Sequence, residues 1–96
     1  MAAYSLTRAA ADDVAEIHSY GLEMFGLREA DDYHNGLEAT FRFLAAYPRA
    51  ARLREETRHQ FRAHPYKAHL IVYKQVDEDH IVILRIRSGR EDWINE

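Results

Sequence analysis

Residues 67–87, KAHLIVYKQVDEDHIVILRIR, decide the fold because they contain two strand-like runs separated by a polar turn. The runs at residues 67–75 and 80–87 are rich in Val, Ile and Tyr, which favour an extended backbone. The acidic residues 77–79 separate the runs and are typical of a turn between neighbouring strands. This stretch therefore predicts two antiparallel strands of a small sheet.

Two more strands are predicted outside this stretch. Residues 57–63 have a period of two and stop before Pro65, so we expect a strand there. Residues 3–6 form a short apolar stretch at the N-terminus and predict a first strand. Residues 49–56 show no clear periodicity, and we expect them to form a loop.

Two helices are predicted between the first strand and this loop, because the apolar residues recur there at steps of three and four. Thr7 suits the N-cap of the first helix, and Gly26 suits the position after its last turn. The second helix starts at about Arg28 and ends before Pro48, which disfavours helical geometry in the preceding residue. The two-residue joint that begins at Gly26 predicts an antiparallel helical hairpin.

The apolar stripes of the two helices are expected to form the core rather than a cofactor site. Gly36 interrupts the second stripe at a cost of about 1 kcal/mol relative to Ala, so we expect it to mark a close approach of the helices. Tyr20 and Phe25 widen the stripe of the first helix. The residues expected in the core are Val14, Ile17, Leu37, Phe41 and Leu44.

The elements together predict one α+β domain spanning residues 1–96, with the order β-α-α-β-β-β. The antiparallel helical hairpin is expected to pack on one face of a small, mostly antiparallel sheet. A chain of 96 residues has the usual length of a single domain. The chain has no cysteine, no apolar run long enough to span a bilayer and no signal sequence at its N-terminus, so we expect a cytoplasmic protein without a membrane partner. Its net charge of −3 lacks the basic excess of a free-standing nucleic-acid binder.

Alternation along the last two strands divides their side chains between two faces. We assign one face to the core beneath the helices: Leu70, Val72, Val82, Leu84 and Ile86. The other face is then apolar with arginines toward one end: Ile71, Tyr73, Ile81, Ile83, Arg85 and Arg87. Such a face is seldom left bare, so either a partner covers it or the chain's own tail, with Trp93 and Ile94, folds over it.

Motifs along nearly the whole chain resemble those of ParE toxins, in the RelE/ParE superfamily of toxin–antitoxin proteins. The opening motif consists of Leu6-Thr7, Ala10, Asp13, Ile17, Tyr20 and Phe25-Gly26. The second helix contributes Tyr33, Leu37, Leu44 and Pro48. The strand His69-Leu70-Ile71-Val72-Tyr73 resembles the family's HxIxY strand. Residues 85–92, RIRSGRED, resemble its closing RIxHxRxD segment, although Ser88 stands where the family often has His.

The resemblance implies a toxin that acts by binding proteins rather than by catalysis. ParE-like toxins inhibit DNA gyrase and are neutralised by a ParD-like antitoxin, whose ribbon-helix-helix part binds DNA while its C-terminal segment wraps the toxin. DNA would thus be reached only through the antitoxin, in a hetero-oligomer. The expected antitoxin-binding residues are the apolar and cationic strand face: Ile71, Tyr73, Ile81, Ile83, Arg85 and Arg87. The expected target-binding residues are Arg87, Arg90 and Trp93.

Two alternatives stay open from the sequence. One is RNA cleavage of the RelE type, which needs cations around a phosphate and a general base. Candidates for these roles are Arg62, Arg85, Arg87 and Arg90, with His64 or His69 as the base. Trp93 lies near the place where RelE-like enzymes often have Tyr or His, and an indole is neither acid nor base. The other alternative is a non-toxic member that only binds an antitoxin and helps to repress its operon.

A metal site is not expected, although the chain has six histidines. His59, His64 and His69 recur every five residues, a spacing that places neighbours on opposite faces of a strand. No HxH or HxxxH pair occurs in the sequence, so we predict neither a metal nor any other cofactor.

Overall fold

The structure, a computed structural model, describes residues 2–51, 53–54 and 61–89 of the chain. They form, in order, β1 (Ala3–Leu6), α1 (Arg8–Phe25), α2 (Leu27–Ala46), β2 (Leu53–Arg54), β3 (Phe61–Tyr66), β4 (His69–Asp77) and β5 (His80–Ser88). This succession confirms the predicted order and adds β2, a two-residue strand inside the stretch predicted as a loop.

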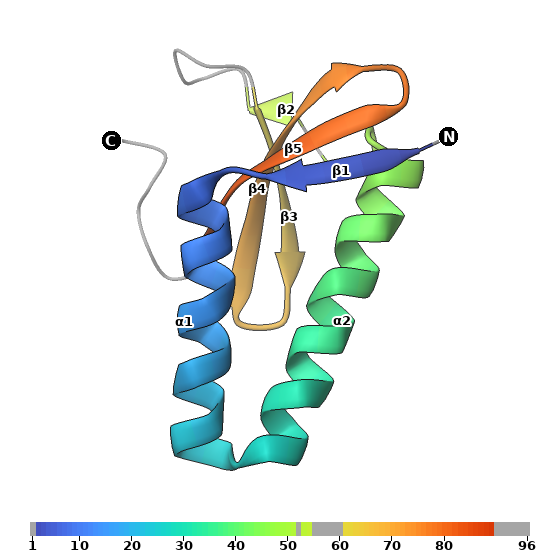
Figure 1. Cartoon of the computed structure of the whole chain (residues 1–96). Coiled ribbons are helices and arrows are strands. Elements are labelled where there is room, and N and C mark those ends of the chain that lie inside the picture. The colour runs from blue at the N-terminus through green and yellow to red at the C-terminus, as the bar shows by residue number, and fades with distance from the viewer. Residues whose placement is uncertain (1, 52, 55–60, 90–96) are drawn as a thin grey trace.

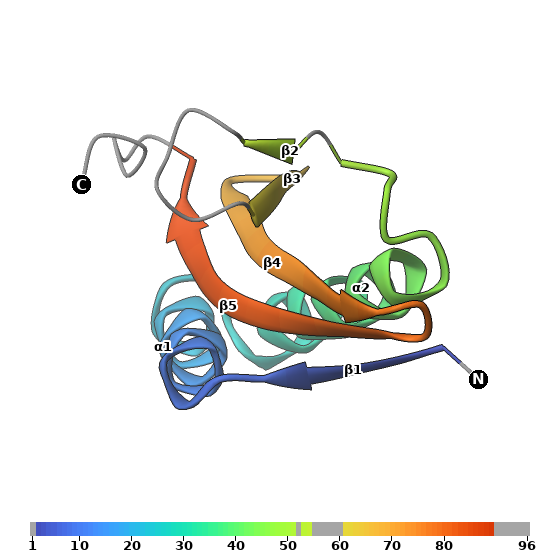
Figure 2. The same ribbon diagram turned by 90° about the horizontal axis from the view of Figure 1, so that it is seen from above.

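The strands form one five-stranded sheet in the order β1-β5-β4-β3-β2. β1 runs parallel to β5, and every other neighbouring pair is antiparallel. The two helices form a hairpin on one face of this sheet, as Figures 1 and 2 show from two directions. The predicted α+β fold class is therefore confirmed.

The predicted caps of α1 and the predicted end of α2 are confirmed, whereas α2 begins at Leu27, so the joint is Gly26 alone and not the predicted two residues. The Thr7 hydroxyl accepts a hydrogen bond from the Ala10 N–H at 3.0 Å, so it caps α1 as the sequence predicts. Gly26 ends α1 with a φ of 89°, a left-handed value that is unfavourable for residues with a Cβ. The C-terminal end of α2 lies just before Pro48, where the Tyr47 N–H bonds the Phe43 carbonyl oxygen at 2.9 Å.

The third predicted strand is shifted along the chain. β3 covers Phe61–Tyr66, so it includes only the last three residues of the predicted segment 57–63, and residues 57–60 lie outside the described part. Pro65 lies inside β3 and is paired in register with Leu70 of β4. β2 pairs with Phe61 and Arg62, so none of the described strands adjoins that side of β3 at Pro65, where an N–H donor is missing.

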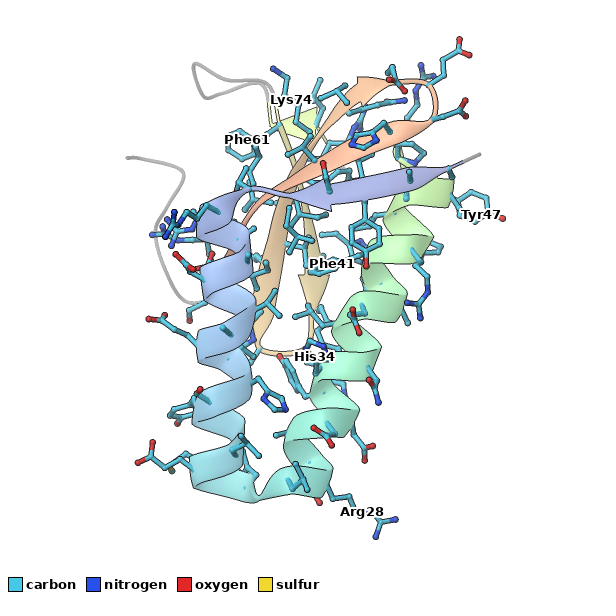
Figure 3. The ribbon with its side chains drawn as sticks, viewed as in Figure 1. Arg28, His34, Phe41, Tyr47, Phe61 and Lys74 are labelled. Carbon is cyan, nitrogen blue, oxygen red and sulfur yellow. The ribbon has the colours of Figure 1, made fainter. Side chains whose placement is uncertain are left out.

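The main core lies between the sheet and the helices, and it corrects the predicted assignment of faces. Four strand side chains expected on the open face are instead completely buried beneath the helical hairpin: Ile71, Tyr73, Ile81 and Ile83. They pack with Leu37, Phe41 and Leu44 of α2, and Figure 3 shows Phe41 pointing from that helix toward the sheet. The Tyr73 hydroxyl donates to the Pro48 carbonyl oxygen at 2.7 Å, which makes a buried phenol tolerable in this core.

The residues predicted for the core lie mostly elsewhere. Val72, Leu70 and Leu84 pack with Phe61 and Ala63 in a second, smaller cluster on the opposite face of the sheet. Val82 is half-buried, and only Ile86 takes the predicted place in the main core. The prediction was wrong because both faces of these strands are apolar, so alternation by itself does not say which face the helices cover.

A β-bulge explains why Ile86 lies on the same face as Ile81 and Ile83. Val72 pairs with Arg85 and Tyr73 pairs with Ile83, so Leu84 has no partner across the ladder. Because Leu84 is one extra residue in the strand, the alternation of side chains between the two faces shifts by one position after it. Ile86 thereby joins the core beneath the helices, and the bulge re-aims the following arginines.

The close approach of the helices is made by a glycine other than the predicted one. A Cβ at Gly21 would lie 3.3 Å from the Ala30 Cβ, which places the tight contact of α1 and α2 near the joint. At Gly36 the space is filled by the Tyr66 hydroxyl from the end of β3, so a Cβ there would overlap that oxygen. Tyr66 in turn donates to the Tyr33 carbonyl oxygen at 3.2 Å. Gly36 therefore accommodates the β3–β4 turn and not the other helix.

Replacing Gly36 by alanine is expected to destabilise the protein by about 1–2 kcal/mol, because overpacking outweighs the gain of about 1 kcal/mol in helix propensity. Urea unfolding of Gly36→Ala measures this loss. The control is the same substitution made in the Tyr66→Phe variant, which lacks the overlapping oxygen. In that variant, Gly36→Ala should be neutral or stabilising. Stabilisation of the otherwise unchanged protein by Gly36→Ala would contradict this account.

Candidate functional site: a groove along the first helix

The second half of β5 is bordered by a helix instead of a strand. β1 pairs only with residues 80–83, whereas β5 continues to Ser88. Side chains at and near the N-terminal end of α1 form hydrogen bonds with the backbone groups along this edge of β5. The Thr7 hydroxyl donates to the Leu84 carbonyl oxygen at 2.8 Å, and the Asp13 carboxylate accepts from the Ile86 N–H at 2.9 Å.

The Asp13 carboxylate also holds Arg85 in a two-pronged ion pair. The Arg85 Nε lies 2.7 Å from one carboxylate oxygen and Nη2 lies 3.1 Å from the other. The Asp13 side chain is 11% exposed, whereas that of Arg85 is 43% exposed. Burial raises the pKa of Asp13, but hydrogen bonds from Arg85 and Ile86 and the charges of Arg85 and Arg87 outweigh it, so that the pKa lies below its ordinary value. This pair fixes α1 against the sheet and orients one wall of the neighbouring groove.

The groove begins beside this ion pair with a polar half of about 340 Å³. Its walls combine acidic and cationic side chains with the edges of two apolar ones: Asp13, Glu16, Ile17, Tyr20, His69, Arg85, Ile86, Arg87 and Ser88. The α1 wall carries carboxylates and the β5 wall carries arginines. Such a pairing of charges suits a polypeptide segment with mixed polar groups better than a purely anionic ligand.

The groove continues into an apolar half of about 230 Å³ toward the joint of the helices. This half is lined by Ile17, Tyr20, Gly21, Phe25, Ala30, Tyr33, Ala68 and His69. Ile17, Tyr20 and His69 line both halves, so the two pockets adjoin, and we call them together the α1 groove. An apolar half beside a charged half is typical of a surface that binds an amphipathic segment of another protein.

The far wall of the apolar half is held by a cluster of aromatic residues. The Tyr33 hydroxyl lies 2.7 Å from the His69 Nδ1, and the rings of Tyr33 and Tyr66 meet edge to face with centroids 5.0 Å apart. The Lys67 ammonium lies 5.4 Å and 5.5 Å from the centroids of these two rings. Lys67 has a left-handed φ of 50°, whose cost is offset by this contact with the rings. Burial raises the pKa of Tyr33, so its hydroxyl keeps its proton.

The sequence-predicted binding residues divide into three groups. Arg85 and Arg87 line the polar half of the α1 groove, and their binding role stays a prediction. The four apolar strand residues Ile71, Tyr73, Ile81 and Ile83 do not reach any surface, because the protein's own helices cover them. Arg90 and Trp93 lie outside the described residues.

Sequence reasoning missed the α1 side of the groove. Tyr20 is 60% exposed and Phe25 is 65% exposed, yet both extend an apolar helical stripe. The signal in the sequence was the widened apolar stripe of α1. A helix that packs on a sheet along one stripe needs fewer apolar positions than α1 carries.

The residues named for RNA cleavage are only partly brought together. Arg62 donates to the Ala51 carbonyl oxygen at 2.8 Å, and His64 packs against the Phe43 ring, where burial lowers its pKa. Neither lines the α1 groove, and Arg90 lies outside the described residues.

His69, Arg85 and Arg87 do share the polar half of the groove. Asp13 and Glu16 lie there with them, and two carboxylates disfavour a phosphate in the same space. The arrangement therefore does not favour nuclease chemistry.

Residues 2–51, 53–54 and 61–89 contain no group of three His, Asp or Glu side chains placed to hold a metal ion. Within the same ranges, neither helix is long and apolar enough to pass through a membrane.

The chain is similar to known proteins in sequence and in fold. The family model described as ParE toxin of type II toxin-antitoxin system, parDE, matches residues 4–93. Toxin ParE3 of Caulobacter vibrioides is 33% identical over 84 residues, which are 88% of this chain and 83% of that protein. Toxin ParE1 of the same organism is 30% identical over 74 residues, 77% of each chain. A solved structure titled Chromosomal ParDE TA system from P. aeruginosa has the same fold, with a TM-score of 0.75, 21% identity and coverage of 92% of this chain and 96% of that one.

Proposed function

The chain belongs to the ParE toxin family of type II toxin–antitoxin systems, and on this premise we propose that it inhibits DNA gyrase by binding it and is neutralised by a ParD-like antitoxin. The observation that carries the proposal is the α1 groove, a pair of adjoining pockets of which one is apolar and the other is lined by charged side chains. The protein acts in the cytoplasm, where gyrase and DNA are. It reaches operator DNA only through the ribbon-helix-helix part of the antitoxin.

The chemistry of the groove describes the antitoxin segment that fits it. Apolar side chains of the segment lie against Tyr20, Phe25 and Tyr33, and an acidic side chain further along meets Arg87. Aromatic and arginine side chains carry much of the binding energy in protein interfaces. The groove thus provides both the hydrophobic anchor and the charged end that fix the direction of the bound segment.

A binding mechanism for the toxin is supported by the state of its polar groups. In the α1 groove, the Asp13 carboxylate is engaged by Arg85 and the backbone of Ile86, and the His69 Nδ1 lies at hydrogen-bond distance from the Tyr33 hydroxyl. A general acid–base pair needs groups that are available to a substrate. The geometry supports recognition of another macromolecule through its surface.

Supercoiling of relaxed plasmid by purified gyrase tests the proposed function. Added protein is expected to inhibit supercoiling, and a stoichiometric amount of the cognate antitoxin is expected to restore it. A translation extract supplemented with the same protein serves as the control, and its mRNA should stay intact. Full supercoiling at a large excess of the protein would count against gyrase as the target.

Tyr20→Ser is expected to weaken antitoxin binding about tenfold or more, because it removes an aromatic anchor from both halves of the groove. Tyr47→Ser is a matched control, since Tyr47 is 63% exposed against 60% for Tyr20 but lies at the other end of the molecule. Figure 3 shows Tyr47 pointing away from the ribbon near the end of α2. Calorimetric titration of the antitoxin measures both affinities. Equal losses for the two variants would show that the α1 groove is not the antitoxin site.

A further inference from the structure

Exposed apolar side chains gather at the joint of the two helices. Nine large hydrophobic residues are exposed in the described part of the chain, and five of them fall within residues 20–27. These five, which we call the hairpin tip, are Tyr20, Leu22, Met24, Phe25 and Leu27. In Figure 1 the joint projects past the turn between β3 and β4, away from the sheet.

Packing among the described residues does not account for the hairpin tip. The helices are in tight contact at Gly21 and Ala30, and the joint beyond them projects past the described part of the sheet. Phe25 and Leu27 are each 65% exposed, and the Phe25 ring packs edge to face on Tyr20 instead of on the core. A soluble domain rarely keeps such a patch without a binding role.

Acidic residues outnumber basic ones in the helical hairpin that carries this apolar patch. Residues 8–46 carry eight acidic residues and three arginines, a formal charge of −5, whereas the whole chain carries −3. Near the joint, Glu23, Glu29, Asp31 and Asp32 outnumber Arg28, whose side chain projects outward at the start of α2 in Figure 3, and Asp31 lies 2.9 Å from the His18 Nε2. An apolar patch with an acidic rim is complementary to an apolar pocket bordered by Lys and Arg.

We propose that the hairpin tip is the surface with which the toxin engages its protein target, at an apolar pocket bordered by basic residues. The inference rests on the proposed function and adds the contact element on the toxin. Tyr20 and Phe25 belong both to the tip and to the apolar half of the α1 groove. An antitoxin segment in the groove therefore covers part of the target-binding surface. Neutralisation follows from this shared occupancy, without any change in the toxin's fold.

The first test replaces tip residues that do not line the α1 groove. Met24→Ser/Leu27→Ser is expected to raise the concentration needed for half-inhibition of gyrase about tenfold or more. Antitoxin affinity and thermal stability should stay within the small range typical of surface substitutions. Val76→Ser is the control, because Val76 is 52% exposed at the opposite end of the molecule and should leave inhibition unchanged.

The second test addresses the charge of the pocket. Glu23→Lys/Asp32→Lys is expected to weaken inhibition by a similar factor, and inhibition by the unchanged protein should fall as salt is raised. Glu78→Lys changes charge equally per residue but lies at the β4–β5 turn, so it serves as the control. Stronger inhibition by the lysine variant would show that the pocket is not basic and would overturn the proposal.

The outcomes separate the inference from the function on which it rests. Undiminished inhibition by Met24→Ser/Leu27→Ser, with the unchanged protein active, overturns the hairpin tip as the contact and leaves the toxin function standing. Absence of inhibition by the unchanged protein overturns both. Light scattering gives the mass of the toxin alone, and a dimer that the tip variant abolishes would identify the occupant as a second copy and overturn the proposal.

Discussion

Ile83→Ala is expected to destabilise the protein by about 3–4 kcal/mol, because it removes buried methyl and methylene groups and leaves a cavity. Ile83 is completely buried, pairs with Tyr73 on one side and Leu6 on the other, and packs in the core beneath the helices. For a domain of this size the loss corresponds to a fall in Tm of about 15 °C or more. Urea and thermal unfolding, followed by circular dichroism, measure it.

Val82→Ala is the matched control for the assignment of faces. Val82 adjoins Ile83 in β5 but is only half-buried, so its truncation should cost about 1 kcal/mol. The face assignment predicted from alternation requires the opposite order, with Val82 in the core and Ile83 on the surface. A larger loss at Val82 than at Ile83 would therefore refute the packing of the sheet described above.

Asp13→Ala is expected to cost about 3 kcal/mol at neutral pH. The substitution removes a two-pronged ion pair with Arg85 and leaves the Ile86 N–H without its acceptor at a half-buried strand edge. Asp13→Asn should cost about half as much, because an amide oxygen still accepts the Ile86 bond. Asp12→Asn is the control: Asp12 is exposed, and the change should stay within about 0.5 kcal/mol.

The contribution of Asp13 also has a predictable pH dependence. Its pKa is lower in the folded protein than in the unfolded chain, so the carboxylate stabilises the fold fully above its unfolded value, roughly pH 4. This stabilisation is lost as the pH falls through the lower folded-state pKa. The difference in unfolding free energy between the protein and Asp13→Asn should be constant above about pH 5 and shrink below about pH 4. A difference that persists unchanged in acid would contradict the role of the charged carboxylate.

Local signals were sufficient to predict the elements of the fold. Thr7, Gly26 and Pro48 mark helix boundaries through hydrogen-bonding capacity and backbone preferences that do not depend on the rest of the molecule. The strands β4 and β5 lie within two residues of their predicted positions. Pro65 misled the placement of β3, because a proline is tolerated inside a strand wherever no neighbour requires its N–H.

The local sequence pattern could not predict features that depend on contacts between distant parts of the chain. Which face of β4 and β5 the helices cover depends on the register of the whole sheet and on the bulge at Leu84, neither of which alternation reveals. The α1 groove exists because β1 stops at Leu6 while β5 continues to Ser88. Arg85 and Arg87 could be named in advance from their charge at the end of a strand. Tyr20 and Phe25 join them only once α1 is placed beside β5.

The side chains of Thr7 and Asp13 at the edge of β5 also limit unwanted self-assembly. An open strand edge can recruit strands from other molecules and start fibrous aggregates. Here the backbone groups of Leu84 and Ile86 are occupied from within the same chain. The sheet is left with a four-residue strand at one border and a two-residue strand at the other. Such short borders are poor templates, so the protein can display an apolar hairpin tip for a specific partner with little risk of polymerising through its sheet.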